Sequence, residues 1–206
     1  MQQYVIYNIV VLSNIWWVIA FIILAYYPIS SFLWKNKTLV HLIIGWCIII
    51  PLFSSLLILY QFNTNSQKLF GSWMIVYILT LISCLDSGAY LFGKLFGKNK
   101  ISKIISPNKT WEGIIGGVVL SYISAYLFYK FKFVHINITM FFILSSFSII
   151  FGILGDLVMS MFKRYANIKN SGFLIPGHGG VLDRLDSLSA SIPIYTYFIL
   201  MTMRIS

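Results

Sequence analysis

Residues 138–162 read ITMFFILSSFSIIFGILGDLVMSMF, and this run contains a single charged residue, Asp156. A helix needs about 20 mainly apolar residues to cross the roughly 30 Å of bilayer hydrocarbon, so the run is long enough to span a membrane. A carboxylate inside such a helix is costly unless it meets a cation, a metal or water. The stretch therefore predicts a membrane-spanning helix whose one acid needs a partner.

The composition of the whole chain fits the same class. Of its 206 residues 59% are hydrophobic and 10% are charged, with a mean hydropathy of +0.85. Soluble domains carry about 25% charged residues, so a soluble globular protein is excluded. An aromatic share of 17% excludes disorder. A net charge of +10 in so apolar a chain favours anionic lipid as the partner, and we expect no nucleic-acid partner.

Six stretches with few charges are long enough to cross the bilayer. They lie at 5–27, 39–60, 71–93, 113–129, 138–162 and 187–203. The first should remain as an anchor, because no basic residue precedes it and no small-residue cleavage site follows it. The short connections leave no room for a soluble domain. We expect one all-α membrane domain over 1–206, a polytopic bundle of about six transmembrane helices.

The basic residues predict how the bundle is oriented. One set of alternate loops holds eleven of them: Lys35, Lys37, Lys94, Lys98, Lys100, Lys103, Lys109, Lys163, Arg164, Lys169 and Arg184. The other set holds four: Lys68, Lys130, Lys132 and Arg204. Lys and Arg concentrate on the cytoplasmic side of membrane proteins. With six spans, the first set is cytoplasmic and both termini are external.

Two acids are expected inside the membrane on the cytoplasmic side. Asp86 lies eight residues before Lys94 and Asp156 lies seven before Lys163. At 1.5 Å per helical residue, each carboxylate is roughly 10 to 12 Å below the end of its span. Each could simply pair with a basic residue for structure. Alternatively, Asp156 shares a helix face with Ser160 and Lys163, which is an arrangement typical of a site.

Two further acids begin the last span. Asp183 and Asp186 are three residues apart and share one face if the helix has begun by Asp183. Helix capping would explain one acid, but it gives no reason for the second. Together with Asp156, and with Asp86 as a weaker candidate, they would form an oxygen site suited to Mg²⁺. We therefore predict a magnesium cofactor.

Two loops on the cytoplasmic side are suited to phosphate. The stretch from 94 to 111 ends in Ser106 and Lys109 just before a helix start, where free N–H groups favour an anion. Ordinary capping and contact with lipid head groups would explain these residues equally well. In the second loop His178, Gly179 and Gly180 allow a ligand to approach the backbone closely, although His178 could also only brace the turn.

These segments resemble the phosphatidate cytidylyltransferases, or CDP-diacylglycerol synthases. The matching runs are SMFKR (160–164), IK (168–169) and IPGHGGVLDRLD (175–186), with DSGAY (86–90), FGK (96–98), ISPNKTWEG (105–113) and GDL (155–157) upstream. They cover roughly residues 83 to 190, the expected catalytic region. Residues 1–80 are expected to supply N-terminal spans, and they match only in being hydrophobic.

The resemblance implies an Mg²⁺-dependent transfer of CMP from CTP to phosphatidic acid in phospholipid biosynthesis, at the cytoplasmic face of the inner membrane. Asp156, Asp183, Asp186 and Asp86 would bind the metal. The phosphates would be bound by Lys163, Arg164, Lys169, Arg184 and His178, and the nucleotide by Ser106, Lys109, Gly179 and Gly180. Members usually have Glu at the position of Met159 and Asp at that of Asn170. The missing charges leave open whether metal affinity or activity is reduced.

Other functions remain open at this point. A cation or proton transporter would also place acids in the membrane, but nearer its middle. A cytidylyltransferase for another lipid phosphate would share every motif, and an inactive scaffold would explain Met159 and Asn170. The sequence does not decide the oligomeric state, a homodimer included, nor the acyl-chain preference.

Overall fold

A computed structural model describes residues 2–33, 37–62, 69–102, 104–131, 136–168, 171–172 and 180–205. The elements in chain order are α1 (Gln2–Ala25), the 3-10 helix η1 (Ile29–Leu33), α2 (Thr38–Gln61), α3 (Phe70–Phe96), β1 (Lys100–Ser102), β2 (Ser106–Thr110), α4 (Trp111–Lys130), α5 (Ile138–Tyr165) and α6 (Leu182–Ile205). The long helices confirm the predicted all-α, multi-pass bundle. Its small sheet, a pair of antiparallel strands, was not predicted.

The helices of the bundle differ in how apolar they are. In the described ranges, α1 to α5 are long and apolar enough to cross a membrane, whereas α6 does not reach that level. The predicted sixth span is a helix, but it begins with charged residues and contains buried hydroxyl groups. The hydroxyl groups of Ser189, Ser191 and Thr196 donate to backbone carbonyls of the same helix, so burial leaves them satisfied.

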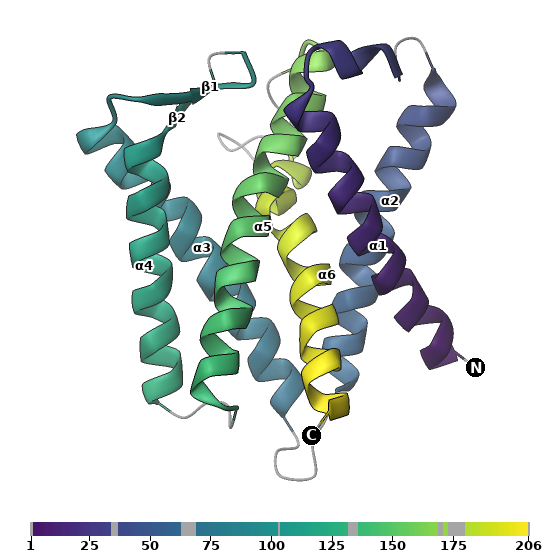
Figure 1. The fold of residues 1–206 in the computed structure, drawn as a ribbon, viewed down its shortest axis with the longest axis vertical. Coiled ribbons are helices and arrows are strands. Elements are labelled where there is room, and N and C mark those ends of the chain that lie inside the picture. The colour runs from purple at the N-terminus through teal and green to yellow at the C-terminus, as the bar shows by residue number, and fades with distance from the viewer. Residues whose placement is uncertain are drawn as a thin grey trace.

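The bundle has two distinct ends. Both termini lie at one end, and the β1–β2 hairpin lies at the other (Figure 1). This agrees with an even number of crossings. The three helices that carry the four predicted aspartates have those residues near the hairpin end, because α3 and α5 finish there and α6 begins there.

Helix α6 holds the two halves of the bundle together. It packs on α5 along its length and also contacts α1 and α2 (Figure 1). Ile192 and Tyr195 belong to one apolar cluster with residues of α3, α4 and α5. Ala190 and Ile194 belong to a second cluster with Trp17 of α1. The helix that carries Asp183 and Asp186 is therefore fixed from both sides.

Helices α3 and α4 pack closely through glycines. A Cβ at Gly88 would lie 2.8 Å from Gly117 Cα, and one at Gly117 would lie 2.5 Å from the Leu85 carbonyl oxygen. Small residues let membrane helices approach closely, which strengthens their packing. This contact fixes the position of α3, and with it Asp86, against the helix that follows the hairpin.

We expect Gly117→Ala to destabilise the protein, because the added methyl meets backbone that cannot move aside. Overpacking of this kind costs about 1–3 kcal/mol. The control is Gly45→Ala on α2, where nothing lies within 4 Å of the new Cβ. Thermal unfolding in detergent should show a lower midpoint for Gly117→Ala only. Equal midpoints would mean that α3 and α4 are not tightly packed here.

Candidate functional site

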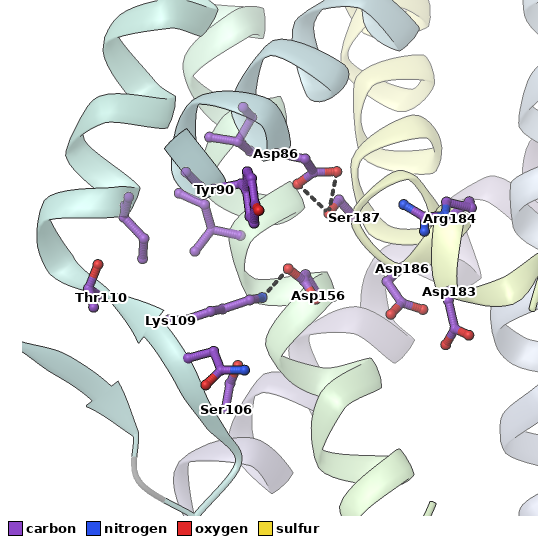
Figure 2. A pocket seen from close by; sticks show the side chains of 15 residues that line it. Asp86, Tyr90, Ser106, Lys109, Thr110, Asp156, Asp183, Arg184, Asp186 and Ser187 are labelled. Atoms are coloured by element: carbon purple, nitrogen blue, oxygen red, sulfur yellow. Dashed lines mark hydrogen bonds and ion pairs between the residues drawn. The ribbon is translucent and has the colours of Figure 1, made fainter. Parts of the chain in front are cut away.

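A cavity of about 390 Å³ lies at the hairpin end, between β2 and helices α3, α4, α5 and α6. Charged and hydroxyl groups line much of it (Figure 2). Its lining residues are Leu85, Asp86, Ala89, Tyr90, Ser106, Asn108, Lys109, Thr110, Ile114, Ile153, Asp156, Asp183, Arg184, Asp186 and Ser187. Segments separated by about 100 residues in the sequence thus form one chamber, in which charged and hydroxyl groups lie beside apolar side chains.

Most of the predicted site residues in the described ranges meet at this cavity. The four aspartates line it together with Ser106, Lys109 and Arg184. Gly180 lies just before α6 and is buried, while Lys163 and Arg164 lie close by on α5 without lining the cavity. Lys169, His178 and Gly179 fall outside the described residues.

The hairpin is attached to the helices around it. The Glu112 carboxylate accepts the backbone N–H groups of Lys98 and Asn99, each at 3.2 Å. At the turn, Arg164 Nε donates to the Ile105 carbonyl oxygen at 3.2 Å. These contacts hold β2 against the cavity. They also give Arg164 a role in positioning the hairpin that the sequence did not suggest.

The start of α4 has fewer free N–H groups than expected. Thr110 is its N-cap, and its hydroxyl accepts the Gly113 N–H at 3.2 Å. The Trp111 N–H donates to the Asn99 carbonyl oxygen at 3.0 Å. The expectation of an open helix N-terminus beside Lys109 was therefore wrong for these two groups. Lys109 itself, and not the helix end, is the strongest anion-binding group on this strand.

Lys109 forms an ion pair with Asp156 across the cavity (Figure 2). The two side chains are 29% and 24% exposed, so the pair is partly shielded from water. Exposed pairs contribute little, but shielding strengthens the attraction between the charges. The pair links the hairpin to α5 and gives the Asp156 carboxylate the partner that its depth requires.

Lys163 contacts both acids at the start of α6. Its ammonium donates to Asp183 Oδ1 at 3.1 Å and also to Asp186 Oδ2. Asp183 additionally accepts the backbone N–H groups of Ser171 at 2.9 Å and Gly180 at 2.8 Å. Burial acts to raise the pKa of Asp183, but these donors outweigh it and hold the pKa below its ordinary value. Asp183 thus binds the backbone that precedes α6.

Asp186 is in a different position from Asp183. Only 5% of the residue is exposed, and its Oδ1 atom has no hydrogen-bond partner among the described residues. A buried carboxylate oxygen without a partner is costly, so it marks a place for a ligand. Asp86, on α3, accepts the Ser187 hydroxyl at 3.0 Å and 3.3 Å, which joins α3 to α6 beside Asp186 (Figure 2).

Comparison with known proteins identifies the family of this chain. Residues 1–202 match the family model described as "Cytidylyltransferase family". The chain belongs to the cytidylyltransferase family. It is 40% identical over 187 residues to a phosphatidate cytidylyltransferase of Haemophilus influenzae, covering 89% of this chain and 65% of the relative.

Two further relatives are also phosphatidate cytidylyltransferases. The one from Staphylococcus epidermidis is 35% identical, covering 89% of this chain and 67% of the relative. The one from Pseudomonas aeruginosa is 35% identical, covering 91% and 67%. This chain of the cytidylyltransferase family thus spans about two thirds of the length of the curated relatives that it matches.

The cavity of this cytidylyltransferase-family chain offers donors that suit a divalent cation. In the described part of the chain, no three acidic, His or Cys side chains form a group close enough to hold a metal ion alone. Mg²⁺ does not need such a group, because it binds through one or two carboxylates and completes its shell with water and substrate phosphate. The unpartnered oxygen of Asp186 and the neighbouring Asp183 fit that mode.

Two positions depart from the family pattern, Met159 and Asn170, and Met159 does not line the cavity. Met159 packs in the apolar cluster around Trp17 and Ile48, on the α2 side of α5. Asn170 lies outside the described residues. A Glu at 159 would therefore point into an apolar region of this structure and would leave the lining of the cavity unchanged.

Several residues at the cavity were missed in the sequence. Ser187 directly follows Asp186 and begins the stretch predicted as the last span, and Tyr90 ends the run DSGAY (86–90). Asn108 lies between Ser106 and Lys109, the two hairpin residues that were predicted. The i+4 spacing of Asp86 and Tyr90 was the one available signal, since both then lie on one helix face.

Proposed function

We propose that this chain is a phosphatidate cytidylyltransferase, which transfers CMP from CTP to phosphatidic acid and releases pyrophosphate. The observation that carries the proposal is a cavity in which aspartates from α3, α5 and α6 meet Lys109 and Arg184. Relatives that are 35–40% identical carry this activity in their names. A cytidylyltransferase for another lipid phosphate would use the same residues.

The main obstacle to this reaction is charge repulsion. The phosphate of phosphatidic acid has a second pKa of about 6, so it is largely a dianion at neutral pH and needs no strong general base. CTP is also a polyanion. The protein must therefore hold two anions in line, and positioning together with charge neutralisation supplies most of the catalysis.

In this proposal the hairpin, α5 and α6 each supply residues with a different role. Ser106 and Lys109 bind the triphosphate from the hairpin side, and Arg184 binds phosphate from α6. Lys163 keeps Asp183 and Asp186 together, and Arg164 holds the hairpin turn in place. Lys169, His178 and Gly179 would add phosphate contacts from the loop before α6.

The reaction then needs one displacement at phosphorus. An oxygen of the lipid phosphate forms a bond to the α-phosphorus of CTP, and the bond from that phosphorus to the bridging oxygen of the β-phosphate breaks. Asp186 with Asp183, and Asp156 with Asp86, would hold Mg²⁺. When bound, Mg²⁺ supplies neutralising charge for the α-phosphate and the departing pyrophosphate.

We further propose that the hairpin end faces the cytoplasm of a bacterial inner membrane. The basic residues at the hairpin end support this orientation, because Lys94 at the end of α3 and Lys98, Lys100 and Lys109 in and before the hairpin all lie there. CTP then reaches the cavity from water. The absence of a nucleic-acid partner stays a prediction, and a homodimer stays one of the possible oligomeric states.

The decisive test is to incubate the purified protein with labelled CTP, phosphatidic acid and Mg²⁺. We expect a labelled CDP-lipid and one pyrophosphate for each lipid formed, with both lost on addition of EDTA. A panel of other lipid phosphates identifies the preferred acceptor. Absence of any CDP-lipid, combined with ion flux in proteoliposomes, would support the transporter instead.

A further inference from the structure

The β1–β2 hairpin depends on contacts from outside it for its position. Strand β1 has three residues, and the register between the two strands shifts between Lys100 and Ser102. A two-stranded hairpin on its own is only marginally stable in water. The place of β2 beside the cavity must therefore be fixed by the helices that contact the hairpin.

Glu112, in the first turn of α4, binds the chain that enters β1. Its Oε1 atom accepts the backbone N–H of Asn99 at 3.2 Å and the side-chain amide of Asn99 at 2.8 Å. Its Oε2 atom accepts the backbone N–H groups of Lys98 and Asn99, each at 3.2 Å. The Asn99 carbonyl oxygen in turn accepts the Trp111 N–H at 3.0 Å. We call these contacts of Glu112, Lys98, Asn99 and Trp111 the hairpin clasp.

The hairpin clasp lies next to the strand end that carries Lys109. Lys100 directly follows Asn99 and pairs with Thr110 of β2. Thr110 lies between Lys109 and Trp111. The clasp therefore fixes the end of β2 both through the neighbouring strand and through the start of α4, and Lys109 is one residue away from that fixed end.

Glu112 acts from outside the cavity. It is not among the residues that line the cavity, whereas Ser106 and Lys109 are. The groups that donate to it are backbone N–H groups and one amide, so the clasp is made by hydrogen bonds to neutral donors. A substitution of Glu112 thus releases the strand that carries Ser106 and Lys109 and leaves every side chain of the cavity wall unchanged.

We propose that Glu112 is a positioning residue for the nucleotide, because the hairpin clasp holds β2 where Ser106 and Lys109 can bind the triphosphate. The inference rests on the proposed function and adds how the hairpin side of the nucleotide site is kept in place. The acids of α6 are held separately by Lys163. Loss of the clasp should therefore weaken the binding of CTP more than the binding of the lipid.

The test compares Glu112→Ala, which removes both acceptor oxygens, with Glu112→Gln, which loses the charge but keeps one oxygen for Asn99. Steady-state rates are measured with CTP varied and then with phosphatidic acid varied. We expect the KM for CTP to rise about tenfold in Glu112→Ala and less than about threefold in Glu112→Gln, with the KM for the lipid within about twofold in both. Equal increases in the two variants would assign the effect to charge and overturn the clasp, as would an unchanged KM for CTP in Glu112→Ala.

The matched control is Ile115→Ala, which shortens an exposed side chain of α4 one turn beyond Glu112 and should change neither KM. Asn99→Ala reaches the clasp from its other side and serves if Glu112→Ala does not fold. It should also raise the KM for CTP. Residues in contact do not act additively, so Asn99→Ala should add little to Glu112→Ala. Fully additive effects would overturn a shared role of the two residues.

Two measurements without lipid keep this test separate from the proposed function. Labelled CTP with Mg²⁺ in equilibrium dialysis should bind Glu112→Ala about tenfold more weakly than the unmodified protein. Trypsin should cleave Glu112→Ala faster after Lys98 and Lys100, because released backbone opens locally. If the unmodified protein binds CTP in this pattern yet forms no CDP-lipid, the proposed function fails and the positioning role stands. Faster cleavage with unchanged CTP binding would overturn the positioning role, and absence of CTP binding by the unmodified protein would overturn both.

Discussion

Asp186→Asn is expected to lower the rate of CDP-lipid formation by about 10²–10³-fold, the effect typical of removing one group that stabilises charge in a transition state. Asp186 has the one cavity oxygen among the described aspartates that is buried without a partner. The amide has nearly the same shape but lacks the charge. Lys163 keeps its contact with Asp183, so the start of α6 should stay in place.

The measurement is the initial rate at increasing Mg²⁺ concentration. Asp186→Asn should require more Mg²⁺ and should not regain the full rate at saturation. Ser191→Ala is the control, because Ser191 lies one turn further along α6 and donates only to backbone. A variant with near-normal rate and Mg²⁺ dependence would show that Asp186 does not bind the metal.

Lys109→Ala is expected to raise the KM for CTP by about 10- to 150-fold, which corresponds to the 1.5–3 kcal/mol of a hydrogen bond to a charged group. Lys109 is the hairpin lysine that the described residues place on the cavity wall. Its removal also leaves Asp156 without a partner, so an additional fall in kcat should follow.

The control for Lys109→Ala is Lys100→Ala, on the other strand of the hairpin and exposed. It removes the same charge from the same element but not from the cavity. Steady-state kinetics with CTP varied at fixed lipid distinguishes the two variants. An unchanged KM in Lys109→Ala would assign this lysine to the lipid surface, and equal effects would indicate a general loss of positive charge.

Helices α1 to α5 were predictable because each is long and apolar enough to be recognised by hydropathy alone. The gathering of Asp86, Asp156 and the α6 acids was also predictable, since all lie near helix ends on one side. The hairpin was not predictable. Its strand β1 has three residues, and contacts from Glu112 on α4 and Arg164 on α5 hold the hairpin in place. Such tertiary contacts leave no periodic signal in the sequence.

Which of the site residues already have hydrogen-bond partners could not be predicted from the sequence either. Asp183 and Asp186 look alike in the sequence, yet Asp183 is occupied by Ser171, Gly180 and Lys163, whereas Asp186 keeps an unpartnered oxygen. Ser187 becomes a partner of Asp86 only because α3 and α6 cross at that level. These distinctions depend on helix packing, which spacing alone does not give.

The three attachments of the hairpin differ in what a nucleotide can replace. Glu112 and Arg164 form hydrogen bonds with main-chain groups at and beside the hairpin, whereas the attachment through Lys109 is the ion pair of its ammonium group with Asp156. An incoming triphosphate can compete for that ammonium while the strands keep their anchors. If the proposed reaction takes place, we expect the Lys109 ammonium to move from Asp156 to the triphosphate on nucleotide binding, without a hinge motion of the hairpin backbone.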